Sequence, residues 1–304
     1  MPQSILRLGT RGSRLALAQA SLVRDALALR DVACELIPLR TTGDRIQDRP
    51  LAALGGKGLF TKELEDALLD GRIDLAVHSM KDVPVALPQG LCIAAILARE
   101  DPRDAFLSPE APSLAKLASG SRIGTSSIRR QAQVARARPD LAIMPLRGNV
   151  DTRLAKLDAG ELDAIILACA GLKRLGMDRR ITAALSLEDW LPALSQGAIG
   201  VESRIEDVHL FSSLNDEATA AALACERGFQ QALDGSCLTS IGGIAELRNG
   251  ELSFRGEVLA PDGSGSAETA FTSQLGAAPV AEAGELGRNA GTELRPRVLQ
   301  WLAA

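Results

Sequence analysis

The chain has 304 residues, of which 46% are hydrophobic and 24% charged, and this composition excludes wholesale disorder and fibrous structure. At roughly 150 residues per domain, the length predicts two domains and allows three. The 38 acidic and 34 basic residues give a net charge of −4, and aromatic residues make up only 3%, with no Tyr, so a nucleic-acid-binding protein is not expected.

The N-terminal segment lacks the features of a targeting signal. Arg7, Arg11 and Arg14 interrupt each apolar run before it is long enough for a signal peptide. No stretch approaches the roughly eighteen apolar residues of a membrane span. The 5 cysteines are widely spread and show no spacing typical of a metal site. We therefore expect a cytoplasmic protein with free thiols, no membrane contact and no metal.

Apolar strands alternate with amphipathic helices along the first hundred residues. This alternation predicts an α/β architecture, because the helices between strands can cover the sheet. The expected strands are Ile5–Leu8, Cys34–Leu39, Ile73–Val77 and Leu91–Ile96, and the expected helices are Leu15–Leu29 and Thr61–Leu69.

The chain also repeats part of its own pattern. Gly9–Arg14 follows an expected strand and opens a helix, and Gly124–Arg130 does the same further along. Asp70–Val77 is echoed by Ala159–Ile166. Because the two echoes occur in the same order, they predict two similar α/β domains.

The boundaries between the parts are polar or contain proline. Arg99–Arg103 suits a linker, and Leu191–Gly200 suits a second crossing between domains. Ala218–Leu233 is typical of an amphipathic helix, after which the composition changes. We expect the C-terminal part to be a small α+β domain, with a hairpin of Leu252–Leu259 and Glu268–Thr272 and a last helix over Thr292–Leu302.

Two turns combine glycine, hydroxyl groups and arginine at the start of a helix. The first holds Arg11 and Ser13, and the second holds Ser126, Arg129 and Arg130. A helix N-terminus binds anions through its unpaired N–H groups and the positive end of its dipole. Capping by the hydroxyl groups is the simpler interpretation, but it leaves the arginines unexplained. We therefore favour anion binding.

Three loops add groups that can take part in chemistry. Arg147–Arg153 follows an apolar strand, so with the two turns it indicates a basic lining for a ligand with several carboxylates or phosphates. Gly55–Phe60 suits either a mobile lid or a plain loop. Lys81 and Asp82 follow a strand, where α/β sheets bind ligands, although taken alone they are better explained as a surface pair.

Together these segments resemble the porphobilinogen deaminase (hydroxymethylbilane synthase) family. The resemblance runs in order from residue 7 to about residue 245. It implies an α/β fold with two periplasmic-binding-protein-like domains, a cleft between them and a small α+β C-terminal domain. The first domain would comprise residues 1–98 and 198–216, the second residues 103–193, and the C-terminal domain residues 217–304. The motifs that carry it are GGKGLFTKELE (55–65), HSMKDVP (78–84), REDPRDAF (99–106), GTSSIRRQAQ (124–133), LRGNVDTRLAKL (146–157) and LDAIILACAGLKRL (162–175).

The resemblance also implies an activity. Members of this family condense four porphobilinogen molecules head to tail, with loss of ammonia, into the linear tetrapyrrole hydroxymethylbilane of haem biosynthesis. The growing chain is primed by a dipyrromethane cofactor, one per chain, held by a thioether to a cysteine that matches Cys237. The substrate is a small molecule, and the family implies a monomer.

Family roles carry over to named positions. Asp82 matches the catalytic aspartate, which stabilises the cation left after deamination, and Gly55, Gly56, Lys57, Gly58 and Phe60 match a mobile lid. The remaining positions match groups that bind the cofactor (Lys81, Asp82, Thr125, Ser126, Arg129, Arg130 and Arg147) or the substrate (Arg11, Ser13, Arg147, Arg153 and Arg174).

The sequence departs from the family pattern in two loops. Gly235–Gly242 lacks the usual second glycine and the proline around Cys237, and Ser195 replaces a usual glycine near the second crossing. The alternative hypothesis is a two-domain binding module for polycarboxylates without turnover. Such a module needs neither Asp82 nor Cys237, so their presence favours the enzyme. A phosphate-handling enzyme would need a P-loop or clustered metal carboxylates, which the sequence lacks.

Overall fold

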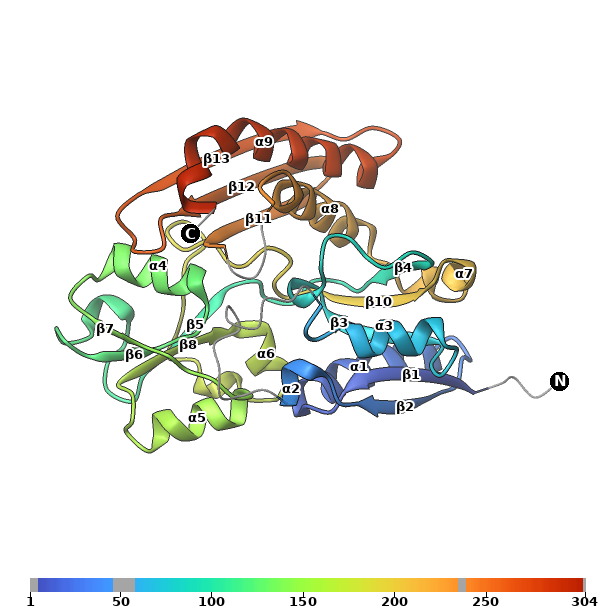
Figure 1. Cartoon of the computed structure of the whole chain (residues 1–304), viewed down its shortest axis with the longest axis horizontal. Helices are drawn as coiled ribbons and strands as arrows, with labels where there is room; N and C mark the ends of the chain where they lie inside the picture. The colour runs from blue at the N-terminus through green and yellow to red at the C-terminus, as the bar shows by residue number, and fades with distance from the viewer. Residues whose placement is uncertain (1–4, 46–57, 235–238, 303–304) are drawn as a thin grey trace. The chain divides into compact units, whose positions relative to one another are not determined.

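The computed structural model describes residues 5–45, 58–234 and 239–302 (Figure 1). The chain divides into two compact units, Met1–Glu100 with Ala198–Ala220, and Asp101–Gly197 with Ala221–Ala304. The predicted division into three domains stays a prediction. Within the described residues, no helix is both long enough and apolar enough to cross a membrane.

The first unit is built on a five-stranded sheet with the order β2-β1-β3-β10-β4. β1 runs parallel to β2 and β3, whereas β10 runs antiparallel to both β3 and β4. The strands are β1 (Leu6–Arg11), β2 (Cys34–Leu39), β3 (Leu75–Ser79), β4 (Leu91–Ile96) and β10 (Ile199–Arg204). The helices are α1 (Arg14–Ala28), α2 (Thr42–Arg45), α3 (Lys62–Leu69) and α7 (Val208–Phe211), with short 3₁₀ turns η2 (Met80–Asp82), η5 (Ile205–Asp207) and η6 (Ser212–Leu214).

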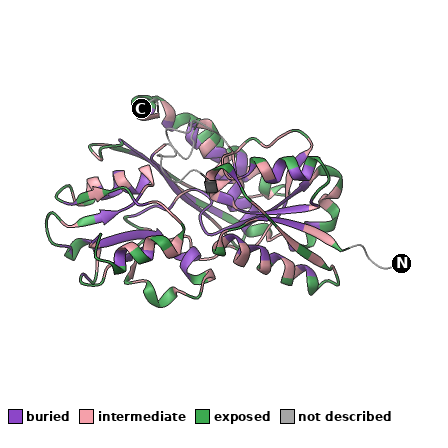
Figure 2. Cartoon of the chain, turned by 60° about the horizontal axis from the view of Figure 1, so that its bottom comes forward, coloured by how far each residue is buried: buried purple, intermediate pink, exposed green. Residues whose placement is uncertain are grey.

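Helices α1 and α3 pack on opposite faces of this sheet. Side chains of a strand alternate between its two faces. Val77 therefore joins the core with Leu27 of α1, whereas Ala76 joins the core with Leu64 of α3. The same alternation places Ser79 on the α1 face and the residue before it on the α3 face. The central strands β3 and β10 are mostly buried, whereas the edge strand β2 has no buried residue. Buried residues are purple in Figure 2.

The second unit contains a sheet of matching topology, with the order β7-β6-β8-β5-β9. The strand flanked by two parallel neighbours is β1 in the first sheet and β6 in the second. Beyond one of these neighbours lies an antiparallel strand, β10 in the first sheet and β5 in the second. The strands are β5 (Asp104–Leu107), β6 (Arg122–Gly124), β7 (Ala142–Met144), β8 (Ala164–Ala168) and β9 (Ala183–Ala184). The helices are α4 (Ile128–Ala137), α5 (Val150–Asp158) and α6 (Cys169–Arg174), with turns η3 (Leu114–Lys116) and η4 (Asp178–Arg180).

The two sheets explain the internal echoes of the sequence. Gly9 and Gly124 lie in the equivalent strands β1 and β6, and the second echo leads into the equivalent strands β3 and β8. This arrangement confirms the α/β fold class with two similar sheets. β10 lies in the first sheet although it follows all five strands of the second, so the chain returns to the first unit.

The C-terminal part adds a three-stranded antiparallel sheet to the second unit, with α8 and α9 against it (Figure 1). Phe229 of α8 packs edge-on against Phe254, with ring centroids 5.0 Å apart, inside the core between helices and sheet. This is the predicted small α+β part. Its elements are α8 (Glu217–Ala232), β11 (Ile241–Arg248), β12 (Glu251–Leu259), β13 (Ser266–Gln274) and α9 (Pro279–Leu302).

The last helix is longer than predicted. It begins at Pro279, whereas the sequence pattern placed its start near Thr292. The extra turns contain glycines at positions buried against α8, and glycine is a weak helix former without an apolar side chain, so the sequence shows no apolar periodicity there. Close approach of the two helices, which needs small side chains, therefore outweighs local propensity here.

We predict that Gly287→Ala destabilises the protein. A Cβ at Gly287 would overlap the backbone carbonyl of Cys225 in α8, which cannot move like a side chain. We expect the free energy of unfolding, measured in urea, to fall by about 1–3 kcal/mol from overpacking. Gly284→Ala is the matched control in the same helix, because its nearest contact, the Ala224 oxygen, lies 3.6 Å away. Equal effects of the two changes would contradict the packing explanation.

Candidate functional site

A polar depression lies at the carboxyl ends of β1 and β3 in the first unit. It is shallow and is lined by Arg11, Ala16, Gln19, Phe60, Thr61, Val77, His78, Ser79 and Asp82. Strand β1 ends at Arg11, and β3 ends at Ser79, directly before the 3₁₀ turn that holds Asp82. The structure thus brings together Arg11, Phe60 and Asp82, three of the residues predicted for the site. We refer to this depression as the Asp82 pocket.

Side-chain contacts order the walls of the Asp82 pocket. The guanidinium of Arg11 lies over the ring of Phe60, 4.2 Å from its centroid, and this cation–π contact joins a predicted anion-binding residue to the predicted lid. Gln19 of α1 is hydrogen-bonded to Ser79 at 2.8 Å. Neither Gln19 nor Ser79 was predicted from sequence. The helical spacing of Gln19 from the first turn was the only signal that could have indicated it.

Two predicted residues of the first unit border the pocket without lining it. Ser13 is the N-cap of α1, and its hydroxyl accepts the backbone N–H of Ala16 at 3.3 Å. Ser13 therefore acts as a helix cap in this structure, two residues after Arg11. Lys81 precedes Asp82 in η2 and is half-buried.

In the second unit, hydroxyl groups fasten the turn that opens α4. The Ser126 hydroxyl donates to the Leu146 carbonyl at 2.9 Å and accepts the Leu146 N–H at 3.0 Å. The buried Thr125 hydroxyl accepts the backbone N–H of Ser127 at 3.2 Å, and Ser127 caps the helix. Ser126 therefore ties this turn to the residue that precedes Arg147.

The arginines that follow this turn are bound to a buried carboxylate. Arg129 contacts Asp104 at 2.8 Å and Arg130 contacts it at 2.6 Å. Trp190 donates its indole N–H to the same carboxylate at 2.9 Å, and the Gln196 amide donates to it at 2.8 Å. All of these side chains are buried. We call this set the Asp104 cluster.

Charge pairing sets the protonation of the Asp104 cluster. Burial acts to raise the pKa of Asp104, but the guanidiniums of Arg129 and Arg130 hold it well below its usual range. Burial lowers the pKa of Arg129, while the charge of Asp104 acts in the opposite direction. The structure thus places the predicted cofactor ligands Arg129 and Arg130 in an ion cluster inside the unit, and their contact with a ligand stays a prediction.

The loop before α5 presents two further arginines. Asn149 caps this helix by accepting the Thr152 N–H at 2.8 Å, and Gly148 has a φ of 106°, a conformation that favours glycine. Arg153 donates from Nε to the Gly148 carbonyl at 2.9 Å, which folds its side chain back onto the loop. Arg147 and Arg153 are both half-buried at the same helix start.

Arg174 lies at the end of α6. Its guanidinium donates to the Gly197 carbonyl at 2.6 Å, next to the Gln196 side chain of the Asp104 cluster. Ser195, which replaces a usual glycine of the family, has a φ of 62°, and this left-handed conformation is strained for serine. The Ser195 N–H donates to Glu226 at 2.5 Å, which helps to hold the strained residue in place.

Some predicted residues lie outside the described part of the chain. These are Cys237, the expected cofactor attachment point, and Gly55, Gly56 and Lys57 of the expected lid. Gly58 and Phe60 of the lid are described, and Gly58 has a φ of 80°.

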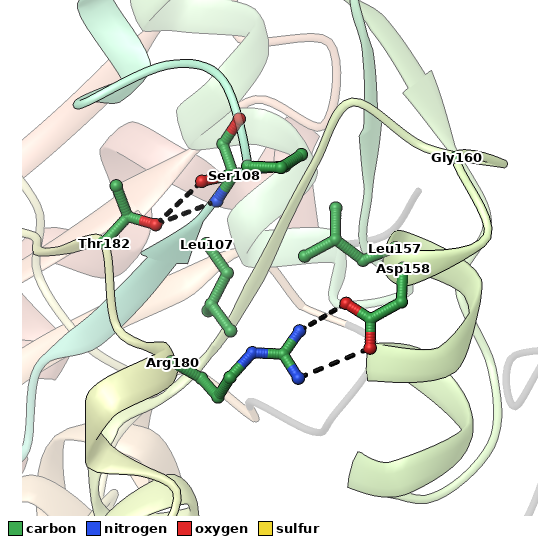
Figure 3. Close-up of a pocket in the computed structure, with 8 residues that line it drawn as sticks. Leu107, Ser108, Leu157, Asp158, Gly160, Arg180 and Thr182 are labelled. Atoms are coloured by element: carbon green, nitrogen blue, oxygen red, sulfur yellow. Dashed lines mark hydrogen bonds and ion pairs between the residues drawn. The ribbon is translucent and has the colours of Figure 1, made fainter.

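A larger pocket lies elsewhere in the second unit (Figure 3). Across it, Arg180 pairs with Asp158 at 2.5 Å, and the Thr182 hydroxyl accepts the Ser108 N–H at 3.0 Å. These polar groups already satisfy one another, and none of the predicted site residues lines the pocket. We therefore assign no site to it.

Comparison with known proteins decides the family. The model described as "Porphobilinogen deaminase, dipyromethane cofactor binding domain" matches residues 6–212, and "Porphobilinogen deaminase, C-terminal domain" matches residues 220–296. A porphobilinogen deaminase of Nitrobacter hamburgensis is 54% identical over 297 residues, which cover 95% of this chain and 92% of the relative. The chain belongs to the porphobilinogen deaminase family. This confirms the resemblance found in the sequence and favours the enzyme over the binding module.

Solved structures with lower similarity were also found. The periplasmic VFT2 domain of Bordetella pertussis BvgS is 16% identical, with a TM-score of 0.42, covering 69% of this chain and 85% of that domain. An ABC-transporter periplasmic substrate-binding protein from Coxiella burnetii is 15% identical, with a TM-score of 0.44, covering 73% of this chain and 97% of that protein.

Family membership sets the reaction and the cofactor. The enzyme is a hydroxymethylbilane synthase: it condenses four porphobilinogens, with loss of ammonia, on a dipyrromethane. The donor set of the second unit fits that cofactor, because each pyrrole unit carries two carboxylates. Guanidiniums recognise carboxylates, and Arg147 and Arg153 supply such groups around the start of α5.

We predict that Asp104→Asn destabilises the second unit. The change leaves two buried guanidiniums without their carboxylate, so we expect the free energy of unfolding in urea to fall by about 3–5 kcal/mol. Asp140→Asn is the control, because Asp140 pairs with Arg138 at an exposed site and has a pKa lowered to about 2 by that partner. A loss for Asp104→Asn no larger than for the control would contradict the role of the cluster.

The same variant changes the acid sensitivity of the protein. A carboxyl whose pKa is lower in the folded state stabilises the fold fully above its unfolded pKa of about 3.9, and this stabilisation is lost as the pH falls further. The wild type should therefore lose more stability than Asp104→Asn between about pH 4 and pH 2.

Proposed function

We propose that the Asp82 pocket is where porphobilinogen reacts and that Asp82 is the catalytic carboxylate. The observation that supports this is the pairing of opposite charges in one depression, with Arg11 at the end of β1 and Asp82 after β3. Porphobilinogen carries carboxylates and an ammonium group. Arg11 can bind a carboxylate of the substrate while Asp82 faces its cationic aminomethyl end.

Asp82 acts on charge that develops during the reaction. Departure of ammonia leaves a cation on the substrate, and attack by a pyrrole ring places a positive charge on that ring. A fixed carboxylate stabilises both cations and can take up a pyrrole proton. The hydrogen bond between Gln19 and Ser79 orders another part of the same pocket.

The remaining residues bind the acidic chain and its primer. When bound, the dipyrromethane supplies the pyrrole to which the first substrate is added. We propose that Cys237 holds it by a thioether and that Lys81, Thr125, Ser126, Arg129, Arg130 and Arg147 bind its carboxylates. Arg11, Ser13, Arg147, Arg153 and Arg174 bind the substrate carboxylates, each by charge-assisted hydrogen bonds.

We further propose that residues 55–60 act as a lid and that the enzyme works as a cytoplasmic monomer without nucleic acid. The contact of Phe60 with Arg11 supports the lid, because movement of the segment would uncover an anion-binding residue. The acidic net charge of −4 is consistent with the absence of a nucleic-acid partner.

The test of the catalytic role is Asp82→Asn. We expect turnover to fall by about 10²–10⁴-fold, the range for loss of a general acid or base, with little change in KM. The Asp82 side chain is half-buried and is not part of a core, so the variant should fold. Asp66→Asn on the exposed face of α3 is the control. Turnover of a folded, cofactor-loaded Asp82→Asn variant close to that of the control would refute the assignment.

A further inference from the structure

A third titratable residue, besides Arg11 and Asp82, lines the Asp82 pocket. His78 borders it from β3, but its ring lies on the α3 face of the sheet and is only 3% exposed. Its Nε2 lies 2.9 Å from a carboxylate oxygen of Glu202 in β10, which is 0% exposed. The alignment of the strands explains this contact: Ala76 lies opposite Glu202, and His78 follows two residues later on the same face.

Glu202 and His78 depend on each other. Neither Nε2 nor either carboxylate oxygen of Glu202 has another hydrogen-bond partner among the described residues. An unpaired buried carboxylate is costly, so the contact with the imidazole compensates for much of its desolvation. A carboxylate on one ring nitrogen also selects the neutral tautomer with its proton on that nitrogen. The other nitrogen, Nδ1, then carries a lone pair.

Two acidic or neutral titratable groups lie near this pair. Glu65 of α3 is buried, and burial raises the pKa of its carboxyl, an effect that the charge of Glu202 increases and Thr61 and His78 oppose in part. Burial likewise raises the pKa of Cys92 in β4, beside Glu202. The nearest strand arginine, Arg204, is paired with Asp74 and Asp207. His78 is therefore the only described basic group that Glu202 contacts.

We propose that His78 is a proton acceptor of the condensation, acting at Nδ1, and that Glu202 is its positioning residue. The arrangement is the one in which a buried carboxylate holds an imidazole as a general base and stabilises the imidazolium that forms. The inference rests on the proposed placement of the reaction in the Asp82 pocket. It assigns to His78 the pyrrole proton that Asp82 could otherwise take up, and it leaves Asp82 to stabilise the cations.

The proton balance of the step is complete. The C–N bond of the substrate breaks, and ammonia leaves with both electrons of that bond. A pyrrole carbon of the second reactant then forms the new C–C bond with a pair of ring electrons. Its C–H bond breaks, the electrons return to the ring, and the proton passes to Nδ1 of His78. The imidazolium returns this proton to ammonia, which leaves as ammonium.

The first test reads the tautomer of His78 directly. The chain contains 2 histidines, and the second, His209, is exposed. In a His209→Gln protein labelled with ¹⁵N-histidine, NMR therefore reports one imidazole. At the pH of the activity assay, we expect a proton on Nε2 and a bare Nδ1. A proton on Nδ1, or on both nitrogens, would overturn the proposal, because neither form accepts a proton there.

The second test measures the rate of condensation. We expect His78→Gln to lower single-turnover condensation by about 100-fold or more while KM and the cofactor mass of the intact protein stay unchanged. His209→Gln is the matched control, and Glu202→Gln should lower the rate and disturb the tautomer together. A rate for the loaded His78→Gln protein close to the control would refute the proposal. If the His78 variant does not fold, the tautomer measurement in the His209→Gln protein still tests whether Nδ1 can accept a proton.

Comparison with Asp82→Asn separates this inference from the proposed function. Loss of turnover in Asp82→Asn with a normal rate in His78→Gln would remove only the role of His78. Normal rates in both variants would show that the reaction takes place away from the Asp82 pocket.

Discussion

The second unit depends on one buried carboxylate. Asp104 opens β5, and its two oxygens bind side chains from α4 and from the segment that returns toward the first unit. Because both guanidiniums and the carboxylate are removed from water, the cluster is stable only when every partner is present. It therefore fixes the positions of β5, α4 and the segment around Trp190 and Gln196 relative to one another.

The cluster is extended by a second set of buried polar contacts. Arg129 donates to the Leu191 carbonyl and to Gln133, and Gln133 donates to Glu257 of β12 at 2.6 Å. Arg136 of α4 also pairs with Glu257, at 3.0 Å. One face of α4 thus connects the five-stranded sheet of the second unit to its three-stranded sheet. The arginines of this chain consequently serve two purposes: some hold the unit together, and others lie half-buried at loops where acidic ligands can reach them.

Much of the fold followed from sequence, because the pattern and the packing agree. The strands at Cys34–Leu39 and Leu91–Ile96 have the predicted bounds, and the two echoes correspond to equivalent strands. The predicted start of α9 was wrong, because the glycines through which this helix packs leave no apolar periodicity in the sequence. The half-buried motif residues Arg11 and Asp82 could be found from their positions at or just after strand ends. The partners of Arg129 and Arg130 could not, because no local pattern shows that Asp104 lies beneath them.

The contact between His78 and Glu202 could not be predicted from sequence either. Their separation in sequence is large, and only the pairing of β3 with β10 brings them together. The sequence places His78 in a motif but indicates no role for it. Residues that act through a long-range carboxylate partner are in general visible only once strand alignment is known.

The most direct test of the enzyme assignment is the intact mass of the purified protein, followed by peptide mapping around Cys237. A dipyrromethane primer predicts an added mass of two porphobilinogens less two ammonias, located on Cys237. A chain that stays unmodified after incubation with porphobilinogen would contradict the assignment of Cys237 as the attachment point and of the chain as a cofactor-primed synthase.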